Sequence, residues 1–334
     1  MNKGLVHIDN PEGHRKAYAN LFTQIFGFSE LVSPVAWKSI RPLIQADKLL
    51  FATVGRHFKR HLLVTIFRAI LNKPSATLFL GASDYCKGKK KRFDFLLLKL
   101  WKVLPKQQLF AIISYKVLPE LSEITNGYIY DPQLWDIWIE RSNTKLPKTK
   151  LSIELSEISK GRKTLLFIGK TKSSKSYNEF VDFSIANSKE VCAVSAGKVA
   201  IECAGKANQL KSNKMIVIDR YISDEELLSL YGIADFVWCY YGVKYDQSSG
   251  VYGRAIQLGI PTIIRKNSTV HKIARDFKIP SHAIDIETNS NYRNIYEKMK
   301  ASKSNVLSET ERKDLFENLY KESVLKLKDA LKLD

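Results

Sequence analysis

The 334-residue sequence lacks the features that mark several common protein classes. It has few cysteines, and they form neither a C-x-x-C pair nor, with the histidines, a spacing suited to zinc. No apolar run approaches the roughly 18 residues of a membrane span, and MNKGLVHID predicts a short strand, not a signal peptide. Internal repeats, low-complexity segments and a D-x-D triad are also absent. We therefore expect a cytoplasmic protein with four reduced cysteines, namely Cys86, Cys192, Cys203 and Cys239.

Positive charge is abundant and unevenly distributed. The chain has 53 Lys and Arg residues against 34 Asp and Glu residues, a net charge of +19. Residues 1–150 carry 24 basic and 11 acidic side chains, whereas residues 151–334 carry 29 and 23. Such a surface attracts phosphate backbones, but zinc-finger spacing, RNP-like strands and an uninterrupted basic helix are missing. We therefore expect no specific nucleic-acid partner.

Two basic clusters in the first half precede aromatic-rich apolar segments. Arg56–His61 leads into Leu62–Arg68, and Lys87–Arg92 leads into Phe93–Lys102. Basic residues next to amphipathic apolar segments fit docking on an anionic membrane leaflet. The other interpretation is a helix whose core face carries the apolar residues, with the charges in a solvated loop. In the second segment these apolar residues are Leu96, Leu97, Leu100 and Trp101.

The most informative segment runs from Asp219 to Pro261 and predicts alternating helices and strands. Its parts are a helix opened by the capping box of Ser223 and Glu226, a buried strand at Ala234–Cys239, a loop to Asp246, a helix after Ser249-Gly250, and a strand from Thr262. A glycine-containing turn at a helix N-terminus presents free N–H groups and the positive end of the helix dipole to a diphosphate. Any doubly wound α/β domain also contains such turns.

The first half predicts an α/β domain of its own. A strand at Leu5–Asp9 and a turn precede an amphipathic helix at His14–Phe26. Further strands are predicted at Leu49–Val54, Ala76–Leu80, Leu109–Ser114 and Gly127–Tyr130. A polar linker follows at Arg141–Lys150, and a capping box at Ser308 and Glu311 opens a last helix that reaches Leu333.

The order "strand, loop, S-G at a helix start, A-x-x-x-G-x-P, strand" resembles the GT-B glycosyltransferases of the large family 4/1-like group, which includes many lipopolysaccharide and capsule enzymes. Upstream, Thr164–Lys170 followed by Lys175, Ser176 and Tyr177 is similar to that family's first C-terminal strand and phosphate loop. Met215–Ile218 resembles its strand before the helix. The resemblance covers about residues 160–285 and is most specific at 219–261.

The resemblance implies an α/β fold of GT-B type, with two Rossmann-like doubly wound domains facing a central cleft. The implied limits are 1–140 for an acceptor-binding domain, 141–160 for the linker, 161–305 for a nucleotide-sugar-binding domain, and 306–334 for a helix packing back on the first domain. The implied donor ligands are Gly169, Lys170, Lys175, Tyr221, Ile222, Gln247, Ser248, Ser249, Gly250 and Arg254. No metal or other cofactor is expected, because helix dipole and cations can stabilise a leaving diphosphate.

One departure from the family concerns its usual carboxylate pair. Many members carry acidic residues where this chain has Gln247 and Arg254. Arginine can bind phosphate or a donor carboxylate with two parallel hydrogen bonds, so Arg254 is predicted to grip the donor. The other interpretation is an ion pair between Arg254 and a neighbouring acid such as Asp246.

Candidate catalytic residues follow the first strand, because the family places that loop opposite the donor sugar. They are Asp9, Glu12 and His14, of which Glu12 and His14 are the main candidates for base and acceptor contact. Asp9 and Glu12 are equally suited to a turn and to a helix dipole.

The resemblance predicts a glycosyltransferase that moves a sugar from a nucleotide-sugar to a glycan or lipid-linked acceptor in bacterial surface polysaccharide synthesis. It would lie in the cytoplasm and bind the anionic inner face of the cell membrane peripherally. Two alternatives remain open, a nucleotide-sugar epimerase of the same architecture and a non-catalytic binding or scaffold protein.

Overall fold

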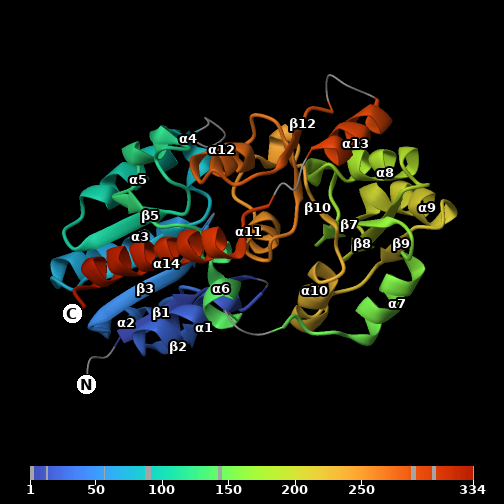
Figure 1. The fold of residues 1–334 in the computed structure, drawn as a ribbon. Coiled ribbons are helices and arrows are strands. Elements are labelled where there is room, and N and C mark those ends of the chain that lie inside the picture. Colours follow the sequence, from blue (N-terminus) through green and yellow to red (C-terminus); the bar gives the residue numbers. More distant parts are fainter. Residues whose placement is uncertain are drawn as a thin grey trace. The chain divides into compact units, whose positions relative to one another are not determined.

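The chain divides into two compact units, each built around a parallel sheet (Figure 1). The computed structural model describes residues 4–12, 14–55, 57–86, 92–141, 145–286, 291–302 and 306–333. Unit 1 comprises Met1–Pro132 and Asn318–Asp334, and unit 2 comprises Gln133–Glu317. The predicted α/β fold class is confirmed by these two sheets and their flanking helices.

Unit 1 contains a six-stranded parallel sheet in the order β2-β1-β3-β4-β5-β6. Its strands are β1 Gly4–Ile8, β2 Ser29–Val32, β3 Lys48–Val54, β4 Ser75–Phe79, β5 Gln107–Ala111 and β6 Gly127–Tyr128. Its helices are α1 His14–Phe26, α2 Trp37–Gln45, α3 Phe58–Ile70, α4 Ala82–Cys86, α5 Arg92–Val103, the 3-10 turn η1 Pro119–Glu123 and the last turns of α14 Glu309–Leu331. The four strands predicted after the first match β3 to β6, although β5 begins two residues earlier and β6 is shorter than predicted.

Unit 2 contains a second six-stranded parallel sheet in the order β12-β11-β10-β7-β8-β9. Its strands are β7 Lys163–Ile168, β8 Val191–Ala196, β9 Ile216–Ile218, β10 Phe236–Cys239, β11 Thr262–Arg265 and β12 His282–Ile284. Its helices are α6 Asp136–Arg141, α7 Lys150–Ile158, α8 Tyr177–Ala186, α9 Ala204–Ser212, α10 Asp224–Tyr231, α11 Gly250–Gln257, α12 Thr269–Asp276 and α13 Tyr292–Ala301, with 3-10 turns η2 Pro132–Leu134, η3 Ser173–Lys175, η4 Ile201–Cys203 and η5 Val243–Tyr245.

The segment predicted as a linker is partly helical. The Thr149 hydroxyl accepts a hydrogen bond from the backbone N–H of Ser152 and opens α7, which continues to Ile158. Leu155 is buried on this helix. A side-chain cap and a buried apolar residue are sufficient to order this part, whereas residues 142–144 lie outside the described chain.

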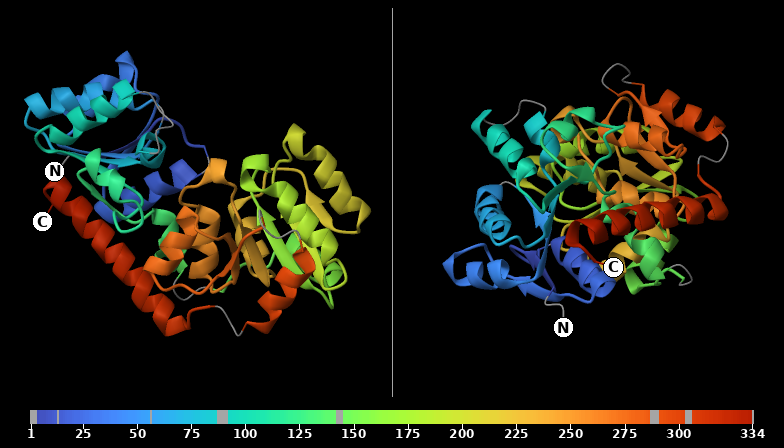
Figure 2. Two further views of the ribbon diagram at one scale, coloured as in Figure 1. Left: turned by 90° about the horizontal axis from the view of Figure 1, so that it is seen from above. Right: turned by 90° about the vertical axis from the view of Figure 1, so that its left-hand side faces the viewer.

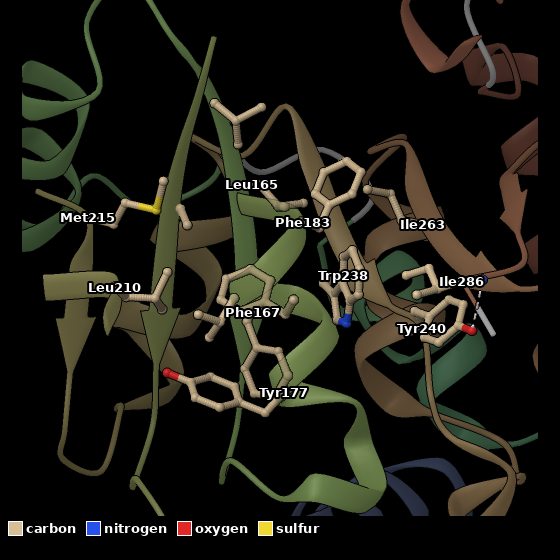
Figure 3. Close-up of a cluster of buried hydrophobic side chains, with 14 of the residues drawn as sticks. Leu165, Phe167, Tyr177, Phe183, Leu210, Met215, Trp238, Tyr240, Ile263 and Ile286 are labelled. Carbon is tan, nitrogen blue, oxygen red and sulfur yellow. Dashed lines mark hydrogen bonds between the residues drawn. The ribbon is translucent and has the colours of Figure 1, made fainter. Parts of the chain in front are cut away.

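The core of unit 2 contains seven buried aromatic side chains. In Figure 3, Phe167 and Tyr177 lie on one side of Trp238, and Tyr240 lies on its other side. All four side chains belong to the buried cluster between the sheet and its helices. The Tyr240 hydroxyl accepts a hydrogen bond of 3.3 Å from the backbone N–H of Ile286. The strand residues Phe167 and Trp238 are thus fixed by packing directly before the loops that leave the carboxyl ends of β7 and β10.

The last turns of α14 complete unit 1 (Figure 2). The backbone N–H of Tyr130 donates to the Ser323 hydroxyl over 3.1 Å. The Lys326 ammonium lies 3.8 Å from the centre of the Tyr128 ring, and Lys48 donates to the carbonyl of Lys332. Residues more than 190 positions apart in sequence therefore pack in one unit.

Each sheet has one place where the strand order reverses. In unit 1, β1 lies between β2 and β3, and in unit 2, β7 lies between β8 and β10. Loops leaving neighbouring strands diverge there to opposite faces of the sheet, which leaves a crevice at the carboxyl ends of the strands. Ligands of open α/β sheets bind at such switch points, so the loops after β1, β3, β7 and β10 are the candidate positions for a site.

Candidate functional site

Two glycines allow the loops after β7 and β8 to approach each other closely. Gly169 follows β7 with φ +103° and Gly197 follows β8 with φ +138°, a region that side chains other than glycine rarely adopt. A Cβ atom at Gly197 would lie 2.4 Å from the carbonyl oxygen of Gly169. Glycine at position 197 therefore lets the two loops pack backbone to backbone.

Lys175 lies above this turn. A Cβ atom built on Gly169 would be 3.5 Å from the Lys175 ammonium, which also lies 5.5 Å from the centre of the Tyr245 ring. Burial, with a smaller contribution from Lys172, lowers the pKa of Lys175 below its ordinary value. Within the described residues no carboxylate pairs with it. A desolvated cation without a counter-ion attracts an anion.

The loop after β10 meets Lys175 from the other side of the switch point. The backbone N–H of Gly242 donates to the carbonyl of Ser174 over 3.2 Å, which holds η5 against η3. This contact brings the Tyr245 ring to the lysine. Sequence segments about 70 residues apart thus form one anion-attracting corner.

Helix α11 begins at Gly250, where the diphosphate is predicted to bind, and its start is capped by a serine. Ser249 caps the helix by accepting from the Tyr252 N–H over 3.4 Å, and its hydroxyl lies 2.7 Å from the Tyr241 hydroxyl. Gln247 and Ser248 precede it and are half-buried. A Cβ atom at Gly250 would lie 2.1 Å from Oε1 of Gln133. The Gln133 side chain therefore packs directly against Gly250.

Arg254 pairs with Asp136 on α6, not with Asp246. Its Nη2 and Nε lie 2.9 and 3.3 Å from Oδ2 of Asp136, and Gln257 donates to the other carboxylate oxygen. Burial opposes the charge of Arg254, but Asp136 outweighs burial and raises the pKa of the guanidinium. Asp246 instead accepts from the backbone N–H of Thr269 over 2.7 Å and pairs with Arg265. The ion pair expected for Arg254 is present, but its partner is Asp136 and not Asp246. Donor binding by Arg254 stays a prediction.

The other predicted donor ligands differ in exposure. The Tyr221 ring is largely exposed, whereas Ile222 beside it is buried. Lys170 is exposed next to Gly169. Of these two neighbouring donor-ligand candidates, Tyr221 alone presents its side chain to solvent.

At the switch point of unit 1, Asp9 lies beside two histidines that the sequence did not single out. Asp9 Oδ1 is 3.4 Å from Nε2 of His61 on α3, and one ligand atom from each of His7, Asp9 and His61 lies within 4.8 Å of the others. Burial opposes ionisation of Asp9, but the two histidines outweigh it and lower its pKa. Burial, then the neighbouring His61, lowers the pKa of His7 to about 4.

Glu12 and His14, the other predicted catalytic residues, do not join this cluster in what the structure describes. Glu12 is exposed in the turn after β1. His14 is the first residue of α1, and its side chain lies outside the described atoms. The pairing of β1 with β3 brings α3 to Asp9, and no short-range sequence pattern reports such a pairing.

Helices α3 and α5 lie side by side and carry two exposed apolar stripes. Helix α3 lies in the crossover from β3 to β4, and α5 lies in the crossover from β4 to β5. Both crossovers run in the same direction across the sheet, so right-handed connections place the two helices on one face. Of the residues predicted as a helix core face, Trp101 is buried, while Leu96 and Leu100 are exposed. That interpretation is therefore wrong for the two leucines, because they lie on the outer side of α5. The exposed stripes consist of Leu63, Phe67, Ile70 and Leu71 on α3 and its end, and of Phe93, Leu96, Leu100 and Val103 on α5.

Charged groups surround these stripes. Lys59 and Lys99 are exposed on α3 and α5, and the Lys59 ammonium lies 5.5 Å from the centre of the Phe93 ring. Arg92 opens α5, while residues 87–91 of the predicted basic cluster lie outside the described chain. Among the described residues no helix is both long and apolar enough to cross a membrane.

Comparison with known proteins places this architecture. No protein-family model and no curated protein matches the sequence. HepE of Anabaena, solved in complex with UDP, matches with a TM-score of 0.68 and 10% identity over 100% of both chains. The chain has the GT-B fold. Other GT-B matches include MnaA of S. aureus with UDP, with a TM-score of 0.61 and 13% identity over 100% of this chain and 98% of that one.

A third match covers less of both chains. The α,α-trehalose 6-phosphate synthase of Burkholderia multivorans matches with a TM-score of 0.52 and 9% identity, over 87% of this chain and 71% of that one. At such identities the likeness concerns the GT-B fold, and the chemistry must be argued from this chain's own residues.

Proposed function

We propose that this protein is a glycosyltransferase that moves a sugar from a nucleotide-sugar donor to a glycan or lipid-linked glycan acceptor in bacterial surface polysaccharide synthesis. The observation that carries the proposal is Lys175, a desolvated cation without a carboxylate partner in the described chain, beside the Gly169 turn. HepE and MnaA were solved with UDP, and HepE also with UDP-glucose, which supports a nucleotide-sugar as the anion.

In this reaction the bond between the sugar's anomeric carbon and the donor phosphate oxygen breaks, and a bond to the acceptor oxygen forms. The leaving diphosphate takes the electron pair, and Lys175 and the N-terminus of α11 stabilise its charge. The acceptor hydroxyl loses its proton to a base. Asp9, Glu12 and His14 remain the candidates for that base.

Binding and turnover of nucleotide-sugars test the proposal. A panel of UDP-, GDP-, dTDP- and CMP-sugars is screened by thermal shift, because a ligand that binds only the folded state raises its stability by about 2.7 kcal/mol at a hundredfold excess over Kd. We expect one nucleotide class to stabilise the protein selectively and to be released faster when a glycan acceptor is added. A well-folded sample that none of them stabilises would contradict the proposal.

The same measurements separate the two alternatives. An epimerase would interconvert the donor sugar without acceptor-dependent nucleotide release. A scaffold protein would bind without turnover. Acceptor-dependent release of nucleotide with sugar appearing on the acceptor is expected of the transferase alone.

The lipid-linked acceptor requires an approach to a membrane, and we assign this to the stripes of α3 and α5. Within α3 the exposed apolar residues Leu63, Phe67 and Ile70 recur at helical spacing, and Lys59 and Arg60 are exposed at its start. Exposed apolar patches of this kind mark interaction sites, and flanking lysines and arginines favour an anionic bilayer. The proposed partner is therefore the anionic inner surface of the cell membrane, contacted peripherally from the cytoplasm.

A further inference from the structure

The histidine cluster of unit 1 is not explained by sugar transfer, and it has the composition of a metal site. His7 lies on β1, Asp9 in the loop after it, and His61 on α3. The two histidines are each 1% exposed, whereas the Asp9 side chain is 28% exposed. Two imidazoles and one carboxylate thus meet at a buried point with one side open to solvent.

The hydrogen bond of His7 fixes which of its nitrogens is free. His7 Nε2 lies 2.8 Å from the carbonyl oxygen of Ser33. A carbonyl accepts hydrogen bonds only, so this nitrogen carries the proton and Nδ1 presents a lone pair. Nδ1 is buried and has no hydrogen-bond partner within the described chain. Metal-bound histidines show the same arrangement, with the second nitrogen donating to a carbonyl or carboxylate.

His61 is without a hydrogen-bond partner at both ring nitrogens among the described residues. Its Nε2 lies 3.4 Å from Asp9 Oδ1 but not in the alignment that a hydrogen bond requires. The distance is close to about 3.3 Å, the edge of a tetrahedron whose ligands lie about 2.0 Å from a zinc ion. Leaving buried polar atoms unpaired is costly, and a bound ion is one of the few explanations.

The strand ladder is irregular at the same place. The pairing of β1 with β3 shifts register between His7 and Ile8. Such irregularities re-aim side chains and are frequent next to sites. A rival explanation is packing alone, because the Phe51 ring makes edge contacts with both imidazoles, at centroid distances of 5.4 and 4.9 Å.

We infer that His7, His61 and Asp9 bind a divalent transition-metal ion of the Zn²⁺ class through Nδ1 of His7, a ring nitrogen of His61 and Oδ1 of Asp9. Imidazole nitrogens favour zinc and its neighbours over magnesium and calcium, and the exposed side of Asp9 leaves a fourth position for water. The inference does not rest on the proposed function. It competes with that function for Asp9 alone, since a metal-bound carboxylate is a weak base.

The test uses full-length protein purified without a histidine tag. Metal is removed with EDTA, Zn²⁺ or Co²⁺ is returned, and bound metal is counted by mass spectrometry after desalting, with Co²⁺ absorption reporting the ligand geometry. We expect one ion per chain and a rise in Tm. Asp9→Asn, which alters a partly exposed group and keeps its shape, should weaken Zn²⁺ binding at least 10-fold, and His7→Gln should do the same.

Two control variants identify where the metal binds. His282→Gln removes a buried histidine of unit 2, and Cys86→Ser removes the cysteine that is not fully buried. Both should bind Zn²⁺ like the wild type. The inference is overturned if the folded wild type retains no stoichiometric metal, or if Asp9→Asn and His7→Gln bind it unchanged. The second result would place the metal elsewhere, and the first would favour packing on Phe51.

Discussion

The two switch points have the same backbone frame and opposite chemistry. In unit 2 the loops after β7 and β10 bring together glycine backbone, a desolvated lysine and a capped helix start. In unit 1 the loop after β1 and helix α3 bring together two buried histidines and a carboxylate. The strand order determines where side chains converge. The few residues after each strand determine whether the site there can bind an anion or, instead, a proton or a metal ion.

The net charge of each half of the chain does not match the chemistry of its switch point. Residues 1–150 have the larger basic excess, yet their switch point holds two histidines and a carboxylate and neither lysine nor arginine among the three residues of the cluster. Some of the excess lies on exposed helix surface, as with Lys59, Arg60 and Lys99. A basic domain therefore need not have a basic site, and its charge is better read as a property of the surface.

The largest expected effect concerns the glycine backbone of unit 2. In Gly197→Ala the new Cβ atom meets the Gly169 carbonyl at 2.4 Å with φ in the glycine region, so the free energy of unfolding should fall by about 3 kcal/mol or more. In Gly205→Ala in α9, the new Cβ atom would meet nothing within 4 Å beyond its chain neighbours and the helix's own backbone, so stability should be unchanged or rise by up to about 1 kcal/mol. Urea denaturation measures both. Equal stability of the two variants would mean that the loops after β7 and β8 are not in close contact.

The second prediction tests whether the two switch points divide the chemistry. Lys175→Gln should weaken binding of UDP, or of whichever nucleoside diphosphate the screen selects, by about 100-fold, because a hydrogen bond to a charged group contributes about 1.5–3 kcal/mol. Lys170→Gln, which removes an exposed lysine beside the same turn, should cost less than 10-fold, since solvent screens its charge. Isothermal titration calorimetry gives the affinities. An unchanged affinity in Lys175→Gln removes the main support for the donor site.

The third prediction contrasts the surfaces of the units. Ile70 on α3 is 74% exposed within a stripe, whereas Ile201 in unit 2 is 95% exposed on η4. Ile70→Ser should reduce binding to phosphatidylglycerol vesicles about 10-fold through the loss of an apolar side chain from the bilayer.

Ile201→Ser serves as the control and should bind these vesicles like the wild type, and neutral phosphatidylcholine vesicles should bind the wild type weakly. Co-sedimentation distinguishes these outcomes. Equal losses for the two variants, or equal binding to both lipids, would exclude α3 as the docking surface.

The smallest expected effect is a pH dependence that Lys175 gives to unit 2. Its pKa is lowered in the folded state, so between that pKa and the ordinary lysine value of about 10.4 the unfolded chain holds more protons than the folded one. The free energy of unfolding should therefore rise with pH through this window, relative to Lys175→Met. Urea denaturation of both proteins from neutral to alkaline pH measures the difference, and saturating nucleotide should abolish it. A difference that falls with pH would show that Lys175 has a partner.

Local patterns predicted the parts of the fold that depend on neighbours in sequence. Ser223 and Glu226 cap α10 as expected, because the capping box needs only residues three apart. Helical spacing also predicted that α5 is amphipathic. It did not show that Leu96 and Leu100 face outward, since a core stripe and an exposed stripe have the same period.

The rest of the candidate sites depends on pairings that local patterns do not report. Arg254 meets Asp136 across 118 positions, and His61 meets His7 only because β1 and β3 are neighbours. A histidine on a strand and another on a helix look like core residues when taken singly. The strand order is needed to identify the residues after β1 and β3 as candidates for a binding site.

The route of α14 has a consequence for how the protein is made. Unit 2 is continuous in sequence from Gln133 to Glu317, whereas unit 1 combines Met1–Pro132 with Asn318–Asp334, which follow all of unit 2 in the sequence. While the ribosome is still translating unit 2, the Tyr130 N–H lacks Ser323 and the Tyr128 ring lacks Lys326. Unit 1 is therefore begun before unit 2 is translated, but it can be completed only after unit 2 has been translated and residues 318–334 have left the ribosome.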